Sequence, residues 1–270
     1  MAKLYIIGTG LYPDYISLRG LNVLKRVSKI FVETYTSHIS LEVLKDVVTR
    51  YVGNIEFEIL TRKDIEDDNC RKIIECLDKG QDVALLVPGD PMIATTHGYI
   101  RVLVRRRGHD VELIHGVSIV SAVVSLLGLS PYRFGPVCTV TYPRLGVYSH
   151  RPYDVTKQNL ERDLHTLLLL DIKDEGGYMT IQEAVEILRE LENIRKEGVF
   201  SDDRIVLAVA RAGYPDWKVA IFRIRDSDKY DLGPPPHSIV IPARLAEYEA
   251  EVLIHDLGLD SSLVRELLLR

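Results

Sequence analysis

Residues 82–90, which read DVALLVPGD, decide the fold class of this 270-residue chain. The almost wholly apolar run 82–87 predicts a strand that is buried on both faces, as in a parallel sheet. Pro88 and Gly89 end that strand, and residues 95–107 continue with a helical pattern. A buried strand that leads into a helix in this way indicates a βαβ unit and therefore an α/β fold.

The same alternation of strands and helices extends through the first part of the chain. Further strands are predicted at residues 3–7, 29–33, 56–60 and 111–114, and helices at residues 18–27, 40–50, 64–79 and 118–127. Ser40 suits the N-cap of one helix, and Gly80 suits a left-handed C-cap just past another. These elements predict an N-terminal α/β domain, residues 1–116, with a mostly parallel sheet.

The remainder of the chain predicts a second α/β domain, residues 117–270. Strands are expected at residues 137–141, 166–170, 205–210, 218–224 and 238–241, and helices at residues 155–163 and from residue 180 onward. Thr180 and Glu183 have the spacing of a capping box. Since the strands 205–210 and 218–224 follow each other closely, we expect them to pair antiparallel, which makes this sheet mixed.

Composition places limits on where the protein acts and what it binds. The formal net charge of −5 argues against a nucleic-acid-binding protein, which would need a basic face. No apolar run reaches the roughly 18–20 residues of a membrane helix, and the amino terminus does not resemble a signal peptide. Cys70, Cys76 and Cys138 lack a metal-ligand spacing, and free cysteines are typical of a reducing compartment. We therefore expect a cytoplasmic protein without a metal site.

Two turns at predicted strand ends in the first domain are candidate ligand sites, because open α/β sheets bind ligands there. Gly8 and Gly10 allow a tight turn before Leu11, although a plain strand-to-helix turn explains them equally, and Pro13 replaces the third glycine of a dinucleotide fingerprint. Asp90 lies in the rigid segment PGDP, where its carboxylate suits a cation or hydroxyl groups. The alternative is that Asp90 only forms a turn.

The second domain offers two further candidates. Ala210-Arg211-Ala212-Gly213 follows the predicted strand 205–210, and its small residues would admit a ligand. Arg211 suits either a ligand carboxylate or an ion pair within the fold. Residues 234–236 are three prolines, which would hold His237 in a fixed position before the next strand.

Weaker candidates lie on the expected substrate side. His97 follows two threonines at the start of a predicted helix, and residues 142–153 form a polar and aromatic loop that could hold a substrate or pack over the sheet. The sequence has no nucleophile elbow, no P-loop and no metal-binding histidine pair, so hydrolase and ATPase functions lose support.

Seven segments in order make the chain resemble the diphthine synthases, a family of the tetrapyrrole methylase superfamily. They are GTGL, PGDPMIATTH, HGVSIVSA, LHTLLLLDIK, GVFSDD, ARAG and PPPH. Many superfamily members carry Gly-Pro-Gly-Asp after the first strand, whereas this chain reads GTGLYPDY, which is typical of the diphthine branch.

The resemblance implies a homodimeric methyltransferase with S-adenosylmethionine in a cleft between two α/β domains. It also implies that the enzyme trimethylates the amino group of the 3-amino-3-carboxypropyl-histidine of elongation factor 2, in diphthamide biosynthesis. Carried over position by position, it implies these cofactor contacts: Leu11, Asp90, Ile93, Ser118, Ile119, Leu170, Ala212 and His237. Two alternatives remain: a tetrapyrrole or ribosomal RNA methyltransferase, and a non-catalytic protein that binds S-adenosylmethionine.

Overall fold

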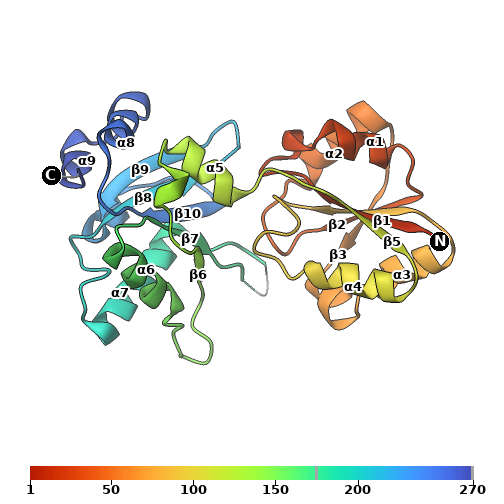
Figure 1. Cartoon of the computed structure of the whole chain (residues 1–270), viewed down its shortest axis with the longest axis horizontal. Coiled ribbons are helices and arrows are strands. Elements are labelled where there is room, and N and C mark those ends of the chain that lie inside the picture. Colours follow the sequence, from red (N-terminus) through yellow and green to blue (C-terminus); the bar gives the residue numbers. More distant parts are fainter. Residues whose placement is uncertain (174–175, 269–270) are drawn as a thin grey trace. The chain divides into compact units, whose positions relative to one another are not determined.

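A computed structural model describes residues 1–173 and 176–268 of the chain. Contacts within the chain divide it into two compact units, Met1–Ile119 and Val120–Arg270. The sequence predicted the division between residues 116 and 117. Each unit is an α/β domain with its own five-stranded sheet, and each is described below by itself (Figure 1).

The sheet of the first unit is entirely parallel, with the strand order β3-β2-β4-β1-β5. Its strands are β1 (Lys3–Gly8), β2 (Lys29–Glu33), β3 (Phe57–Leu60), β4 (Val83–Val87) and β5 (Asp110–Ile114). The central strand β4 is buried along its whole length, as its apolar sequence requires. Because all five strands run in one direction, the loops that follow them share the carboxyl edge of the sheet.

Helices cover both faces of this sheet (Figure 1). They are α1 (Leu18–Leu24), α2 (Leu41–Val52), α3 (Arg71–Asp78) and α4 (Gly98–Arg106). One face packs against α1 and α2, and the other against α3 and α4, so alternate residues of β1 enter different cores. Residues 64–79 do not form the single helix that was predicted. Asn69 and Cys70 adopt left-handed backbone conformations, which separate a π-helical turn at Lys63–Asp67 from α3.

The sheet of the second unit is mixed, with the strand order β6-β7-β10-β8-β9. Its strands are β6 (Cys138–Val140), β7 (Thr166–Leu170), β8 (Ile205–Ala210), β9 (Lys218–Arg223) and β10 (His237–Ile241). Strands β6 and β7 are parallel, whereas β10 is antiparallel to both β7 and β8. The predicted antiparallel pairing of β8 with β9 is confirmed. The predicted α/β fold with one parallel and one mixed sheet is therefore confirmed.

The second unit contains five helices, of which the first starts at the last residue of the first unit: α5 (Ile119–Leu126), α6 (Arg151–Glu161), α7 (Ile181–Arg195), α8 (Glu247–Glu251) and α9 (Ser261–Glu266). Helices α6 and α7 pack on one face of the sheet, and the predicted capping box at Thr180 and Glu183 begins α7. The predicted loop 142–153 is shorter than expected, because α6 already begins at Arg151. Pro152 is the signal that sequence reasoning overlooked, since proline favours the first turn of a helix. Within residues 1–173 and 176–268, no helix is long and apolar enough to cross a membrane.

Candidate functional site

Glycine backbones from three strand ends meet at the carboxyl edge of the first sheet. The N–H of Gly10 donates to the carbonyl of Gly89 at 3.1 Å, and the N–H of Gly89 donates to the carbonyl of Gly10 at 2.8 Å. A Cβ atom on Gly8 would lie 2.5 Å from the carbonyl oxygen of Gly89, and one on Gly116 would lie 2.2 Å from the same oxygen. Side chains are therefore excluded here, and the loops after β1, β4 and β5 lie backbone against backbone.

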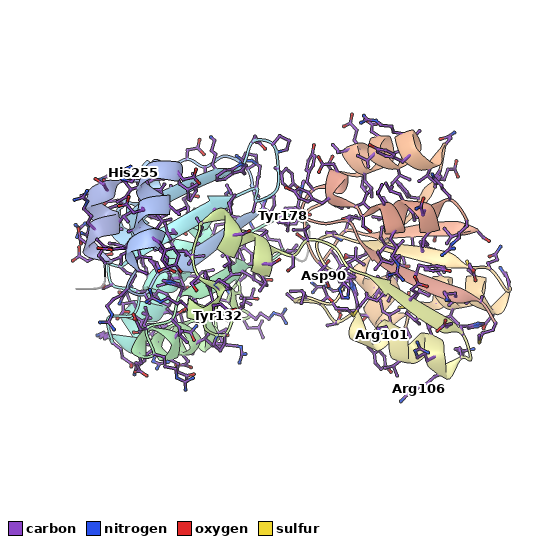
Figure 2. All side chains as sticks on the ribbon, turned by 45° about the horizontal axis from the view of Figure 1, so that its top comes forward. Asp90, Arg101, Arg106, Tyr132, Tyr178 and His255 are labelled. Carbon is purple, nitrogen blue, oxygen red and sulfur yellow. The ribbon has the colours of Figure 1, made fainter. Side chains whose placement is uncertain are left out.

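Asp90 follows this junction directly, where β4 ends (Figure 2). Its side chain is only 8% exposed. One carboxylate oxygen accepts a hydrogen bond from the N–H of Met92 at 2.9 Å, and the other lies 2.8 Å from Nδ1 of His115. One oxygen of Asp90 thus stabilises the turn, while the other contacts a polar side chain. A role in the turn is therefore compatible with a role in binding a ligand.

His115 was not singled out from the sequence. It comes immediately after the strand β5, and its side chain is largely exposed while its Nδ1 contacts Asp90. The signal that could have found it is its position: polar residues directly after β1, β4 and β5 share one edge of a parallel sheet.

Five of the eight predicted cofactor contacts lie on these three loops. Leu11 follows Gly10, Asp90 and Ile93 follow β4, and Ser118 and Ile119 come two and three residues after Gly116. The side chain of Ile93 is 43% exposed and therefore accessible to a ligand. Since Gly8, Gly10, Gly89 and Gly116 are in contact, the structure brings these five positions to one edge of the sheet.

The other three predicted contacts lie on neighbouring strands of the second sheet. Leu170 ends β7, Ala212 comes just after β8, and His237 begins β10, which runs between those two strands. The register places His237 opposite Ala210 of β8 and Ser238 opposite Leu169 of β7. These three residues therefore share one edge of the second sheet.

His237 has a defined hydrogen-bonding state. Its Nδ1 accepts a hydrogen bond from the backbone N–H of Ile181 at 3.2 Å, so the proton of the neutral ring is on Nε2. Burial lowers the pKa of His237, which keeps the ring neutral at pH 7. Nε2 is buried and makes no hydrogen bond of ordinary geometry within residues 1–173 and 176–268, although the carbonyls of Gly233 and Pro234 lie near enough to raise the pKa of the ring. A buried N–H group without a partner is a donor that a ligand can satisfy.

Arg211 forms its ion pair within the fold, which decides between the two roles that the sequence allowed. Its guanidinium donates to the Asp216 carboxylate at 2.8 Å and to the carbonyl oxygens of Leu232 and Pro234 at 2.8 and 2.5 Å. The backbone N–H of Arg211 also donates to the carbonyl of Pro236 at 2.7 Å. Arg211 thus joins the loop after β8 to the proline segment before His237 and fixes both.

The substrate-side candidates differ in their surroundings. His97 is fully buried, and its Nε2 lies 3.2 Å from the hydroxyl of Tyr35. Tyr153 belongs to α6 and is also fully buried, with its hydroxyl donating to Glu192, so for this residue the alternative of packing over the sheet is confirmed. Tyr142 is partly buried, with Lys173 above its ring. Among the described residues, no three His, Cys, Asp or Glu side chains are grouped to hold a metal ion.

Comparison with known proteins identifies relatives along nearly the whole chain. Residues 3–228 match the family of tetrapyrrole (corrin/porphyrin) methylases. The diphthine synthase of Pyrobaculum islandicum is 46% identical over 210 residues, which cover 78% of this chain and 82% of that protein. The diphthine synthase of Methanosphaera stadtmanae is 39% identical over 98% of this chain and 100% of its own length. A crystal structure of diphthine synthase superimposes with a TM-score of 0.84 at 35% identity, covering 98% of this chain and 99% of that one.

Proposed function

Since this chain belongs to the diphthine synthase family of the tetrapyrrole methylases, we propose that it methylates the 3-amino-3-carboxypropyl-histidine of elongation factor 2. The chain is an S-adenosylmethionine-dependent methyltransferase of diphthamide biosynthesis. The observation that carries the proposed substrate is the 39% identity to a diphthine synthase over its full length, because fold alone does not determine substrate.

We propose that S-adenosylmethionine contacts the eight residues that the resemblance implies. In the first unit these are Leu11, Asp90, Ile93, Ser118 and Ile119, and in the second they are Leu170, Ala212 and His237. The residues fit the cofactor chemically. Glycine backbones without side chains allow a close approach, the Asp90 carboxylate suits a cationic or hydroxyl group, and the Nε2–H of His237 is an unsatisfied donor.

The reaction requires a neutral amine in line with the methyl–sulfur bond. S-adenosylmethionine supplies a methyl group on a sulfonium, which is reactive without further activation, so positioning can account for much of the rate. An α-amino-like group has a pKa of about 8 and is mostly protonated at neutral pH. Each transfer forms one C–N bond, breaks one C–S bond and releases one proton. We propose three transfers, which give a trimethylammonium group.

The proposal includes a homodimer that acts in the cytoplasm on elongation factor 2 as its protein substrate. The mild net charge of −5 supports a protein substrate over RNA, because RNA binding is driven by contacts between basic residues and phosphates.

The test is methyl transfer from labelled S-adenosylmethionine to two samples of elongation factor 2. One sample carries the aminocarboxypropyl-histidine, and the other is unmodified. We expect label only on the modified factor, with mass spectrometry of its peptide showing three added methyl groups. If neither sample takes up label while calorimetry shows cofactor binding, the substrate is wrong, and tetrapyrroles and RNA become the candidates.

A further inference from the structure

Three polar side chains outside the proposed cofactor contacts gather at the carboxyl edge of the first sheet. Strand β2 ends at Glu33, and Tyr35 follows two residues later. Strand β2 lies beside β4, whose following loop carries Asp90 and, seven residues further on, His97. Tyr35 and Met92 pack against the same hydrophobic core. Tyr35 and His97, separated by 62 residues in the chain, thus lie close to the loop that bears Asp90.

Glu33 is a buried carboxyl that holds the turn after β2. One of its oxygens accepts hydrogen bonds from the backbone N–H groups of Tyr35 and Thr36 at 2.9 and 3.1 Å, and the other accepts from the hydroxyl of Thr36. The side chain is completely shielded from solvent. Three hydrogen bonds to one carboxyl fix the backbone from which the Tyr35 ring projects.

In the tautomer that carries its proton on Nδ1, His97 accepts a hydrogen bond from the Tyr35 hydroxyl through Nε2. The two rings are perpendicular, with centroids 6.0 Å apart, and Nε2 of His97 lies 3.2 Å from the Tyr35 hydroxyl. Nδ1 is buried and makes no hydrogen bond of ordinary geometry with a described residue, although the Pro91 carbonyl lies near enough to raise the pKa of the ring. Burial lowers the pKa of His97, against a smaller opposing effect of the Pro91 carbonyl, so the ring is a neutral base near pH 7.

Tyr35 connects this buried ring with the outside of the unit, since its own side chain is only partly buried. Burial raises the pKa of Tyr35, so it remains a neutral hydroxyl that donates to His97 and can accept from another group. The charged and titratable groups around the pair are Glu33, Arg62, Glu66 and Cys70. The Arg62 guanidinium lies over the Tyr35 ring, 5.4 Å from its centroid, and Glu66 accepts from the Thr96 hydroxyl at 2.9 Å.

We infer that Tyr35 contacts the target amine and, together with His97, removes its proton. The inference rests on the proposed function. The amine N–H bond breaks as its proton moves to the Tyr35 oxygen, and the Tyr35 O–H bond breaks as that proton moves to Nε2 of His97. The amine keeps the electron pair and uses it for the bond to the methyl group. Tyr35 is then the catalytic residue, whereas His97 acts through Tyr35 and Glu33 positions it.

Proton removal is needed more than once, because the same amine is methylated repeatedly. After each of the first two transfers, the product is an ammonium ion that must lose a proton before it can be methylated again. A hydroxyl backed by a neutral imidazole removes that proton within the site, so the same substrate can react again before it leaves. General base catalysis of this kind typically contributes about 100-fold or more in rate.

The test compares pH profiles of methyl transfer for the wild-type enzyme, Tyr35→Phe and His97→Gln on the modified elongation factor 2. Phenylalanine keeps the ring and its packing but removes the hydroxyl. Glutamine can accept the hydrogen bond from Tyr35 but cannot take its proton. Tyr99→Phe is the matched control, because Tyr99 lies two residues from His97 and its side chain is 53% exposed. Thermal unfolding and calorimetric titration with S-adenosylmethionine check that each variant folds and binds the cofactor.

We expect both relay variants to be about tenfold slower at pH 7, where about one amine in ten is neutral, and Tyr99→Phe to be unchanged. The deficit of the variants should be largest below the amine pKa of about 8, where most of the amine is protonated, and should shrink above that pKa, because the neutral amine reacts without a base. The variants should also release mono- and dimethylated product. Wild-type profiles and product ratios in both variants would overturn the relay alone. No label with the wild-type enzyme would overturn the proposed function, and the relay with it.

Discussion

Gly10 and Gly89 hydrogen bond to each other in both directions, with N–H to carbonyl distances of 3.1 and 2.8 Å. Both glycines have positive φ angles, 76° and 69°, which other L-residues rarely adopt. The pair locks the loop after β1 to the loop after β4. Gly8 and Gly116 both pack against the carbonyl of Gly89. The backbones of these four glycines therefore occupy the space that side chains would otherwise fill at this edge.

Gly8→Ala should destabilise the first unit. The new Cβ atom would lie 2.5 Å from the Gly89 oxygen and 2.6 Å from the Gly116 nitrogen, and neither backbone can move without disturbing the sheet. We expect the free energy of unfolding to fall by about 2–3 kcal/mol, as measured by urea denaturation. Gly98→Ala is the control, because nothing lies within 4 Å of its added Cβ and alanine favours a helix. Equal free energies of unfolding for the two variants would contradict the predicted steric clash at Gly8.

Asp90→Asn should weaken S-adenosylmethionine binding without unfolding the protein. Asparagine can still accept from the N–H of Met92, but it loses the negative charge that suits a cationic or hydroxyl group of the cofactor. A charged hydrogen bond contributes about 1.5–3 kcal/mol, so calorimetry should show an affinity about 10- to 100-fold lower. In contrast, His115→Ala should change the affinity by less than about fivefold, because an exposed partner contributes little. If His115→Ala lowered the affinity more than Asp90→Asn, His115 rather than Asp90 would be the cofactor contact.

Arg211→Lys should loosen the loops around His237. Lysine keeps the charge, but it cannot reach Asp216, Leu232 and Pro234 together as the guanidinium does. Losing the donor to the buried Leu232 carbonyl and the donor to the Pro234 carbonyl should lower the free energy of unfolding by about 2 kcal/mol, which chemical denaturation would measure. The control is Arg225→Lys, since Arg225 is about half exposed in its pairs with Asp203 and Asp226 and should change stability by less than about 0.5 kcal/mol.

Glu33 should make the stability depend on pH. Burial raises its pKa from 4.5 to about 7, so the folded state holds this proton more tightly than the unfolded state does. The resulting stabilisation is complete below about pH 4.5 and is lost as the pH rises through about 7, a change of about 3 kcal/mol. Glu33→Gln, which carries no titrating proton, should therefore gain stability relative to wild type between pH 5 and 8 in urea denaturation.

The control for this measurement is a carboxyl group whose pKa is shifted in the opposite direction. The pKa of Glu58 on β3 is lowered, chiefly by its hydrogen bond with Lys29, so its contribution is present above its unfolded pKa and is lost as the pH falls. Glu58→Gln should thus lose stability relative to wild type at neutral pH and approach it in acid. Parallel pH curves for Glu33→Gln and wild type would show that Glu33 does not titrate in this range.

The sequence alone was sufficient to predict the fold class and most element positions. The apolar run that became β4, the capping box at Thr180 and the strands β2, β7 and β8 were found because strand and helix patterns and caps are local. The resemblance to diphthine synthases, which the comparisons confirm, also rests on segments that can be read one by one. Errors arose where a local signal was overlooked, as with Pro152 at the start of α6.

Only the tertiary structure decided which side chains meet. Tyr35 and His97 are 62 residues apart, Asp90 and His115 are 25 apart, and Ile181 and His237 are 56 apart. The order of strands in the two sheets creates each of these contacts, and local sequence does not encode that order. The same holds for the hydrogen bonds of Arg211 to the carbonyls of Leu232 and Pro234, which depend on how the loop after β8 meets the segment before β10, whereas its ion pair with Asp216 is local. A side chain's chemistry is a local property, but its partner, its burial and hence its pKa belong to the folded chain.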